Sequence, residues 1–463
     1  MPLQTEREKG AHLLRRFGLG ASEAELDYYL RGGISGAIDK LLNYESADEG
    51  FNLPIESLAR DKNGRVPMPA VIGWWLVRLT QTRRPLQERM TLFWHNHFAT
   101  SAEKVKGPML MFGQNEILRK NAVGNFGTLL AEVSKDPAML FWLDNQYNVR
   151  GKANENFARE VMELFTLGIG HYTERDIQES ARAFTGWGIG RTRPEEGRPP
   201  SATFVFRPRQ HDDGDKTFFG QTGPFGGEDI LKMLTDNPRT SEYVASKMWR
   251  FFAYPDPEPE LVSRLAAIFR QSGLEIKSLL RAIITSPEFY SERAERAIYK
   301  NPVDFVIVTA RQMGLGELLG ASEGSGLRGL GPMTQVNQAL KGMGMQLFYP
   351  PDVAGWDQGA AWITTATMVE RIGWADRLFP SRPGQRAVLP LDAYGLFEAD
   401  PSAEGVVSKL VSLFDAPLPE SKRRGLLDAA VKASGGRVGR ENANATASAV
   451  ARLIFAAPEF QFC

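Results

Sequence analysis

Apolar residues recur at the spacing of an α-helix along most of this chain. Between residues 261 and 269, and again between 157 and 165, they stand at positions i, i+4, i+7 and i+8, which lines them up on one helical face. The ends of these segments carry matching signals, because Gly168 and Gly273 follow them and Pro85 stands where a first helical residue belongs. The pattern predicts an all-α, mostly helical multi-helix protein.

One segment departs from the helical pattern. Residues 190–227 are rich in Gly and Pro and contain an alternating run at 203–206, a turn-rich string at 210–215 and an apolar run at 217–219. This order is typical of a β-hairpin. The sequence therefore predicts a small β-hairpin insertion.

Two other loop-rich stretches, residues 314–332 and 380–390, are typical of linkers or mobile loops. Together with the insertion they predict four consecutive segments. These are an N-terminal helical region, the insertion, a helical region with an aromatic loop and a C-terminal helical region, at residues 1–190, 191–227, 228–379 and 380–463.

The second half of the chain contains a degenerate repeat. Five landmarks around Lys247 recur at a constant offset around Lys409. A Pro-Glu pair then opens a helix in each copy, and the string Pro-Glu-Phe closes each copy, at 287–289 and 458–460. These ordered landmarks predict a duplicated three-helix unit, although unrelated amphipathic helices also resemble one another.

Charge and cysteine content exclude several functional classes. The 463 residues include 55 Lys and Arg against 55 Asp and Glu, so the chain lacks the broad positive field that nucleic-acid binding usually needs, and no nucleic-acid partner is expected. The single cysteine, Cys463, excludes a disulfide framework, a four-Cys zinc site, a Cys-ligated iron–sulfur cluster and c-type haem within one chain. No phosphate-binding Gly loop, dinucleotide fingerprint or nucleophile elbow occurs, so no nucleotide cofactor is expected.

The sequence also bears on membrane insertion and on the cellular compartment. No run of eighteen apolar residues occurs, so no membrane insertion is expected. Residues 1–10 include four consecutive charged side chains and lack the apolar core of a secretory signal. The chain as written is predicted to be cytoplasmic, and export stays open if a leader was removed.

Metal chemistry in this chain would need His and carboxylate ligands. His95 and His97 end a helix whose apolar stripe His97 continues. On an unbroken helix the two rings point about 200° apart, so they share one ion only if the helix ends near Asn96 and the chain turns extended. The alternative is a core histidine at 97 bonded to the backbone and a surface histidine at 95.

A second polar group lies on the helix that follows residue 155. Asn156, Glu160 and Glu163 share one face by their i, i+4 and i+7 spacing, opposite the apolar stripe, and Arg159 lies near them. This face is either solvated or an acidic site in which Arg159 or a metal offsets the like charges.

His171 follows the glycines that end this helix. It stands just before Thr173, which forms a capping pattern with Asp176 for the next helix. A helix N-terminus disfavours imidazolium and so favours the neutral ring, which suits metal binding or general-base work. The alternative is that His171 merely fills a turn.

His211 and Asp212 lie in the turn-rich string of the insertion. Asp-rich turns with Gly are ordinarily turn chemistry, because Asp bonds its own backbone and Gly accepts positive φ. On a projecting hairpin, however, these two side chains would be able to close over a helical site and supply a ligand or carry a proton.

An aromatic loop with paired prolines covers residues 348–356 and is followed by Trp362. Exposed Trp rings would stack on sugars or cations, whereas buried rings are core, and we favour the core.

Several long strings occur together in the order typical of one family. They are residues 12–18, 94–98, 154–167, 172–174, 185–187, 211–220 and 350–356. Over nearly its whole length the chain resembles the bacterial family called domain of unknown function 1800 (DUF 1800). The resemblance implies a largely helical bacterial protein with no established reaction. Members often look exported, and the absence of a leader here departs from that pattern.

The resemblance also implies that the polar strings meet in one cleft. Our leading hypothesis is a metal-dependent enzyme, most plausibly a hydrolase that uses water bound to a divalent transition metal. Candidate metal ligands are His95, His97, Glu163 and His171, and candidate catalytic residues are Glu160 or His211 as general base, Arg159 as anion clamp, and Asp212. The alternatives are a non-catalytic helical scaffold that binds a protein or glycan partner, and a purely structural polar network.

Overall fold

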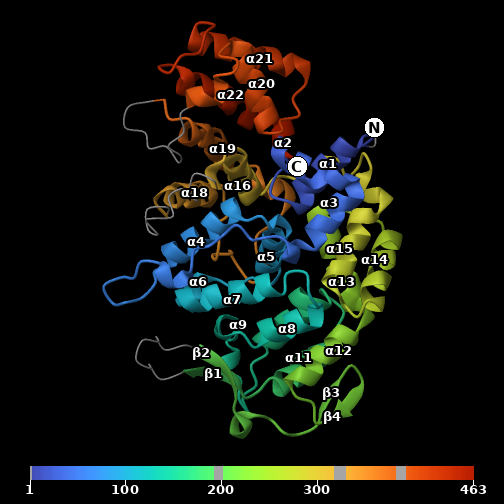
Figure 1. Cartoon of the computed structure of the whole chain (residues 1–463). Coiled ribbons are helices and arrows are strands. Elements are labelled where there is room, and N and C mark those ends of the chain that lie inside the picture. Colours follow the sequence, from blue (N-terminus) through green and yellow to red (C-terminus); the bar gives the residue numbers. More distant parts are fainter. Residues whose placement is uncertain (1–2, 192–201, 317–329, 382–392) are drawn as a thin grey trace. The chain divides into compact units, whose positions relative to one another are not determined.

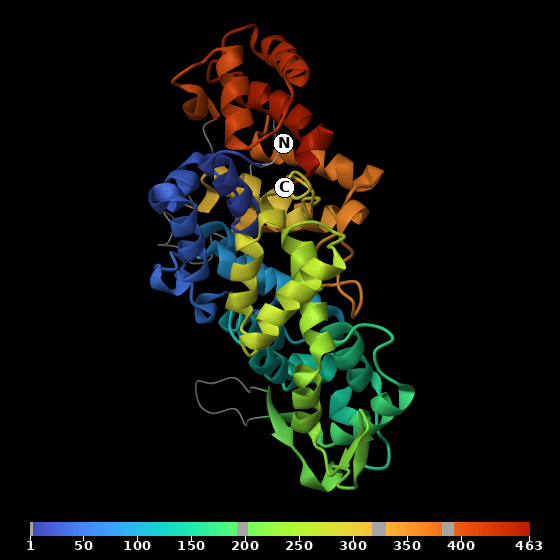
Figure 2. The same ribbon diagram turned by 90° about the vertical axis from the view of Figure 1, so that its right-hand side faces the viewer.

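Helices dominate the chain, and the fold class expected from the sequence, all-α with a small β insertion, is confirmed (Figures 1 and 2). The computed structural model describes residues 3–191, 202–316, 330–381 and 393–463. Contacts divide the chain into two units, each described separately below. Unit 1 comprises Met1–Leu86, Pro287–Leu347 and Asp357–Cys463, and unit 2 comprises Gln87–Ser286 and Phe348–Trp356.

This division differs from the four consecutive segments expected from composition, whose boundaries stay a prediction. The predicted loops at 314–332 and 380–390 fall largely outside the described residues.

Unit 1 is built around α4, because this helix is buried on every side from Ala70 to Thr80. Trp75, Leu76 and Leu79 are fully buried in it, and helices α16 and α18 pack on it. Arg311 of α16 donates hydrogen bonds to the carbonyl oxygens of Leu79 and other residues at the end of α4, which satisfies groups that a helix leaves unpaired. The helices of unit 1 are α1 (Glu6–Phe17), α2 (Glu23–Tyr29), α3 (Gly33–Leu42), α4 (Met68–Gln81), α16 (Pro302–Gln312), α18 (Leu330–Gly342), α19 (Thr365–Leu378), α20 (Ala403–Leu413), α21 (Glu420–Ser434) and α22 (Ala443–Ala456).

Unit 2 has a core of aromatic side chains. Trp94, Phe98 and Phe126 are buried around His97. The helices are α5 (Pro85–His97, in unit 2 from Gln87), α6 (Ala102–Val105), α7 (Pro108–Lys120), α8 (Phe126–Ser134), α9 (Pro137–Trp142), α10 (Asn156–Glu160), α11 (Glu174–Ala183), α12 (Gly227–Asp236), α13 (Pro238–Phe252), α14 (Pro259–Gln271) and α15 (Ile276–Thr285). A π-helical segment, Val161–Thr166, continues directly from α10.

In place of the single β-hairpin that we expected, the structure contains two antiparallel strand pairs. Strand β2 (Ala202–Phe206) pairs antiparallel with β1 (Trp187–Arg191), and β3 (Lys216–Phe218) pairs antiparallel with β4 (Gln221–Gly223). Both apolar runs are therefore strands, as predicted, but they do not pair with each other. The reason is local: Gly220, with φ +76°, lets the chain reverse directly after β3.

The predicted duplication is present as two sets of three consecutive helices. In unit 2 the set is α13, α14 and α15, and in unit 1 it is α20, α21 and α22. Within each set neighbouring helices pack on one another, and a 3₁₀ turn beginning Pro-Glu-Phe follows each third helix. The apolar stripe of α14 is buried at Leu261, Leu265 and Phe269, whereas Ile268 is 38% exposed.

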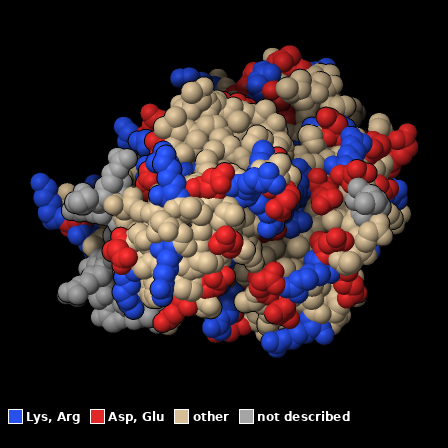
Figure 3. Space-filling view, turned by 90° about the horizontal axis from the view of Figure 1, so that it is seen from above, with Lys and Arg blue, Asp and Glu red and all other residues tan. Residues whose placement is uncertain are grey.

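Charges are mixed on the surface. Figure 3 shows one face, on which basic and acidic side chains are interspersed, as their equal numbers in the sequence suggest. Within the described ranges, no helix has both the length and the apolar character needed to cross a membrane.

Candidate functional site

His95, an expected metal ligand, is buried in unit 2 and bonded to the backbone. Its Nε2 accepts a hydrogen bond from the N–H of Phe348 at 3.0 Å. Desolvation lowers the pKa of His95 to about 3, so the ring is neutral. The side chain is 1% exposed, so the alternative of a surface histidine at 95 is wrong.

His97 is bonded to a different backbone group. α5 runs unbroken through His97, and Nε2 lies 3.1 Å from the carbonyl oxygen of Phe165. Because a carbonyl only accepts, Nε2 carries the proton. Desolvation first, and then the charge of Lys247, lower the pKa of His97 well below its ordinary value. The alternative of a core histidine bonded to the backbone is confirmed at this position.

The aromatic loop is core, as we favoured. Phe348 and Trp356 are buried, and the backbone N–H of Trp356 donates to Asn96 Oδ1 at 2.7 Å. The loop is thus held on α5 by His95 and Asn96.

Arg159, the expected anion clamp, already holds a carboxylate. Its two terminal nitrogens donate to both oxygens of Glu174 at 3.0 and 2.9 Å. Glu160, the expected general base, is half-buried, and desolvation followed by the charge of Glu163 raises its pKa.

Glu163 and His171 lie on consecutive segments, and Glu163 lines a pocket. Its carboxylate accepts a hydrogen bond from the Tyr172 hydroxyl. His171 is exposed. The predicted capping pattern after it is present, with Thr173 and Asp176 bonded to each other's backbone groups at the start of α11.

His211 and Asp212 belong to a network that attaches the insertion to α11. Arg182 donates to both carboxylate oxygens of Asp212 at 2.8 and 3.1 Å, and this pairing lowers the pKa of Asp212 to about 2. His211 Nδ1 lies 2.9 Å from the carbonyl oxygen of Thr185 and so donates to it. This geometry is that of a structural network, which was one of the alternatives.

The expected metal ligands are not gathered together. Over the described part of the chain, no three His, Cys, Asp or Glu side chains are placed to hold one metal ion. His95 and His97 each use one ring nitrogen, Nε2, on a backbone group, and His171 lies at the surface. The donor geometry therefore lends no support to a metal centre, and the metal set stays a prediction.

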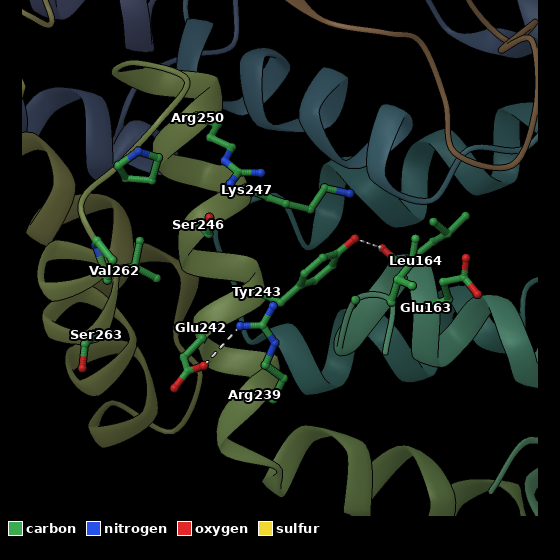
Figure 4. Close-up of a pocket in the computed structure, with 14 residues that line it drawn as sticks. Glu163, Leu164, Arg239, Glu242, Tyr243, Ser246, Lys247, Arg250, Val262 and Ser263 are labelled. Atoms are coloured by element: carbon green, nitrogen blue, oxygen red, sulfur yellow. Dashed lines mark hydrogen bonds and ion pairs between the residues drawn. The ribbon is translucent and has the colours of Figure 1, made fainter. Parts of the chain in front are cut away.

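A pocket of about 630 Å³ lies in unit 2 between α13, the start of α14 and the π-helical segment (Figure 4). Of the sequence-predicted site residues, Glu163 lines it. The charged or aromatic side chains that α13 contributes are Arg239, Glu242, Tyr243, Lys247 and Arg250.

Sequence reasoning did not identify these α13 residues as a site. A signal was present, because Tyr243, Lys247 and Arg250 stand at i, i+4 and i+7 and form a polar stripe along one helical face. A polar stripe on an amphipathic helix is ordinarily solvated, and only packing shows that this one faces a pocket.

The end of the π-helical segment is held by side chains around this pocket. The Tyr243 hydroxyl donates to the carbonyl oxygen of Leu164 at 3.0 Å, and Arg239 Nε donates to that of Leu167 at 3.0 Å. His97 Nε2 donates to the carbonyl oxygen between them, that of Phe165. Carbonyls at a helix end lack helical partners, so these three side chains fix the wall that carries Glu163. π-Helical turns of this kind occur frequently at functional sites.

Lys247 has no anionic partner, whereas Arg239 on the same helix is paired with Glu242. Figure 4 shows the side chains of Lys247 and Tyr243 leaving α13 on the same side, and the Lys247 ammonium lies 5.2 Å from the centroid of the Tyr243 ring. Among the residues that the structure describes, no hydrogen bond or ion pair to this ammonium occurs. Desolvation first, and then the charge of Arg250, lower the pKa of Lys247 to about 8.

Comparison with known proteins identifies the family and leaves the function open. No curated protein and no solved structure matches the chain. The family model described as "Protein of unknown function (DUF1800)" matches residues 12–462. With nearly its whole length matched, the chain belongs to this family, DUF1800.

Proposed function

We propose that unit 2 binds a small anionic molecule in the pocket between α13, α14 and the π-helical segment. The observation that supports this most is the desolvated Lys247 ammonium, which lacks a carboxylate partner. Removing a charge from water without pairing it destabilises a fold. A perturbed titratable group in a cleft is a recognised sign of a functional site.

Arg250 adds to this argument. It lines the same pocket one helical turn after Lys247, and two like charges at i, i+3 repel each other. A bound carboxylate or phosphate would neutralise both cations at once. Arg239 is less available, because it is bonded to Leu167 and Glu242.

The functions expected from the sequence have weaker support. Metal-dependent hydrolysis needs ligands that converge, and the described His and carboxylate side chains do not. A helical scaffold is compatible with the duplicated three-helix unit, but no feature of the described surface indicates a protein or glycan partner.

Anion binding is tested by isothermal titration calorimetry and thermal unfolding with inorganic phosphate, acetate, succinate and pyruvate. At a ligand concentration 100 times its Kd, we expect about 2.7 kcal/mol of stabilisation. Lys247→Met should abolish this effect. Lys409→Met is the matched control, because Lys409 occupies the equivalent position in the second three-helix unit and is exposed. No binding of any anion, or equal loss in both variants, would contradict the proposal.

A further inference from the structure

A lysine that is to act as a nucleophile must be neutral, and its surroundings decide whether it is. Lysine is activated when it is desolvated or when it stands beside another cation. Lys247 meets both conditions, because it is partly buried on the pocket wall, which desolvates it, and Arg250 follows it on the same face of α13.

The charged and titratable groups around Lys247 come from three elements. On α13 they are Arg239, Glu242, Tyr243 and Arg250, on α5 His97, and on the π-helical segment Glu163. His97 is neutral in the core, and the Glu163 carboxylate is engaged by Tyr172. No carboxylate in this set pairs with the ammonium, which lies 5.2 Å from the centroid of the Tyr243 ring, so the neutral amine forms close to physiological pH.

Tyr243 sets the position of this amine. Its ring flanks the Lys247 side chain, and its own hydroxyl is occupied by the carbonyl of Leu164. Tyr243 is therefore a positioning residue that leaves the Lys247 amine facing the pocket.

We infer that Lys247 forms a Schiff base with a small carbonyl compound that carries a carboxylate or phosphate group, with Arg250 binding that group. This inference rests on the proposed anion-binding function and names its substrate class. A guanidinium suits both carboxylate and phosphate, since its planar fork matches their oxygens.

The step balances without a redox partner. The lone pair of Lys247 Nζ attacks the carbonyl carbon, and the carbonyl oxygen takes up a proton to give a carbinolamine. Loss of the hydroxyl as water breaks the C–O bond and leaves an imine. The net change is amine plus carbonyl to imine plus water. Glu163 lines the pocket and is a carboxyl group that can carry protons in these steps.

The test is reductive trapping of the full-length protein with pyruvate and sodium cyanoborohydride, followed by peptide mass spectrometry. We expect the reduced adduct on Lys247, with labelling that increases as pH rises through 8. Arg250→Met should lower the labelling rate about tenfold with pyruvate, the effect of one charge-assisted contact. It should lower the rate less with acetone, which has no anionic group and is affected only through the rise in the pKa of Lys247 when the neighbouring charge is removed.

Two other lysines serve as controls. Lys409→Met should label at Lys247 as the wild type does. Lys300 also has a lowered pKa, about 7, but its ammonium lies over the Phe460 ring and the residue is buried. Labelling at Lys300 or Lys409 equal to that at Lys247 would show that pyruvate reacts with lysines without regard to the pocket, and would overturn the inference.

Failure of the inference and failure of the proposed function give different results. If pyruvate, acetate and phosphate stabilise the protein through Lys247 but no adduct is trapped there, anion binding stands and the Schiff base is refuted. If an adduct forms on Lys247 but non-carbonyl anions do not bind, the Schiff base stands and general anion binding is refuted. If neither is seen, both are wrong.

Discussion

At the scale of single residues, burial decides the protonation of the side chains that looked functional in the sequence. His95 and His97 are neutral because they are desolvated in the core, and each bonds a backbone group. Desolvation also lowers the pKa of Lys247, but Lys247 lines a pocket. Access to a pocket thus separates the candidate site from the structural histidines.

Acid is expected to destabilise unit 2 through these histidines. Unfolded histidine titrates near 6.5, whereas His95 stays neutral in the fold down to about 3, so below pH 6.5 the unfolded chain binds a proton that the folded chain does not. Between pH 6.5 and 5 this difference at His95 reduces the free energy of unfolding by about 2 kcal/mol, and His97 acts in the same direction. Urea unfolding followed by circular dichroism at pH 7, 6 and 5 measures the loss.

His95→Gln is the informative variant for this prediction. The amide oxygen of the new side chain can accept a hydrogen bond from the Phe348 N–H but does not titrate. The free energy of unfolding should therefore fall less between pH 7 and 5, by the contribution of one histidine. His171→Asn, which changes an exposed ring, should leave the dependence unaltered. Equal slopes for wild type and His95→Gln would contradict the assignment.

Lys247 should lower stability at neutral pH, in contrast to an ordinary surface lysine. Its folded pKa of about 8 lies below the ordinary 10.5, so the full penalty is present below pH 8 and disappears as pH rises from 8 to 10.5. The shift corresponds to an upper limit of roughly 3 kcal/mol. We therefore expect Lys247→Met to unfold at higher urea concentration than wild type at pH 7, with a gain that shrinks toward pH 10.5.

The control for this prediction is again Lys409→Met, which should leave the free energy of unfolding within about 0.5 kcal/mol of wild type. A less stable Lys247→Met would show that the side chain contributes packing that outweighs its desolvation.

At the scale of elements, the π-helical segment Val161–Thr166 is bonded both within itself, where the Thr166 hydroxyl donates to the carbonyl oxygen of Val161 at 2.7 Å, and to its neighbours. Its hydrophobic spacing at Phe157, Val161 and Phe165 predicts an ordinary helix, and those residues are buried as predicted. The wider turn leaves carbonyls that His97, Tyr243 and Arg239 bind. This arrangement links the core histidine to the pocket wall.

Tyr243→Phe should therefore destabilise the π-helical segment locally and leave the packing of the aromatic core intact. Loss of one hydrogen bond to Leu164 is expected to lower the free energy of unfolding by about 1 kcal/mol and to speed amide hydrogen exchange at residues 161–168. Tyr28→Phe, at an exposed tyrosine of α2 in unit 1, should change neither quantity. Unchanged exchange in Tyr243→Phe would mean that the segment is stable by itself.

At the scale of the whole molecule, one three-helix unit occurs twice and serves two different purposes. α13 packs on the π-helical segment, whereas α20 packs on the 3₁₀ turn Ala393–Phe397. As a consequence Lys247 lines a pocket, and its counterpart Lys409 is exposed. The repeat is thus a shared scaffold, and what each copy contacts sets the chemistry of equivalent residues.

Local patterns in the sequence determined the helices, their caps and the repeat, because spacing, Pro, Gly and capping residues act over a few positions. The Pro85 start, the Thr173 capping box and the two three-helix sets follow from such signals. Family membership also follows from the sequence, since it rests on strings of residues.

Only the tertiary structure decided which polar residues face a pocket and which strands pair. Whether a histidine binds a ligand or a carbonyl depends on groups far along the chain: His95 meets Phe348, and His97 meets Phe165. The polar stripe through Lys247 has the pattern of a solvated helix face, and only the π-helical segment packed near it makes that face part of a pocket. Desolvation arises from neighbours distant in sequence, so periodicity within one helix carries no information about it.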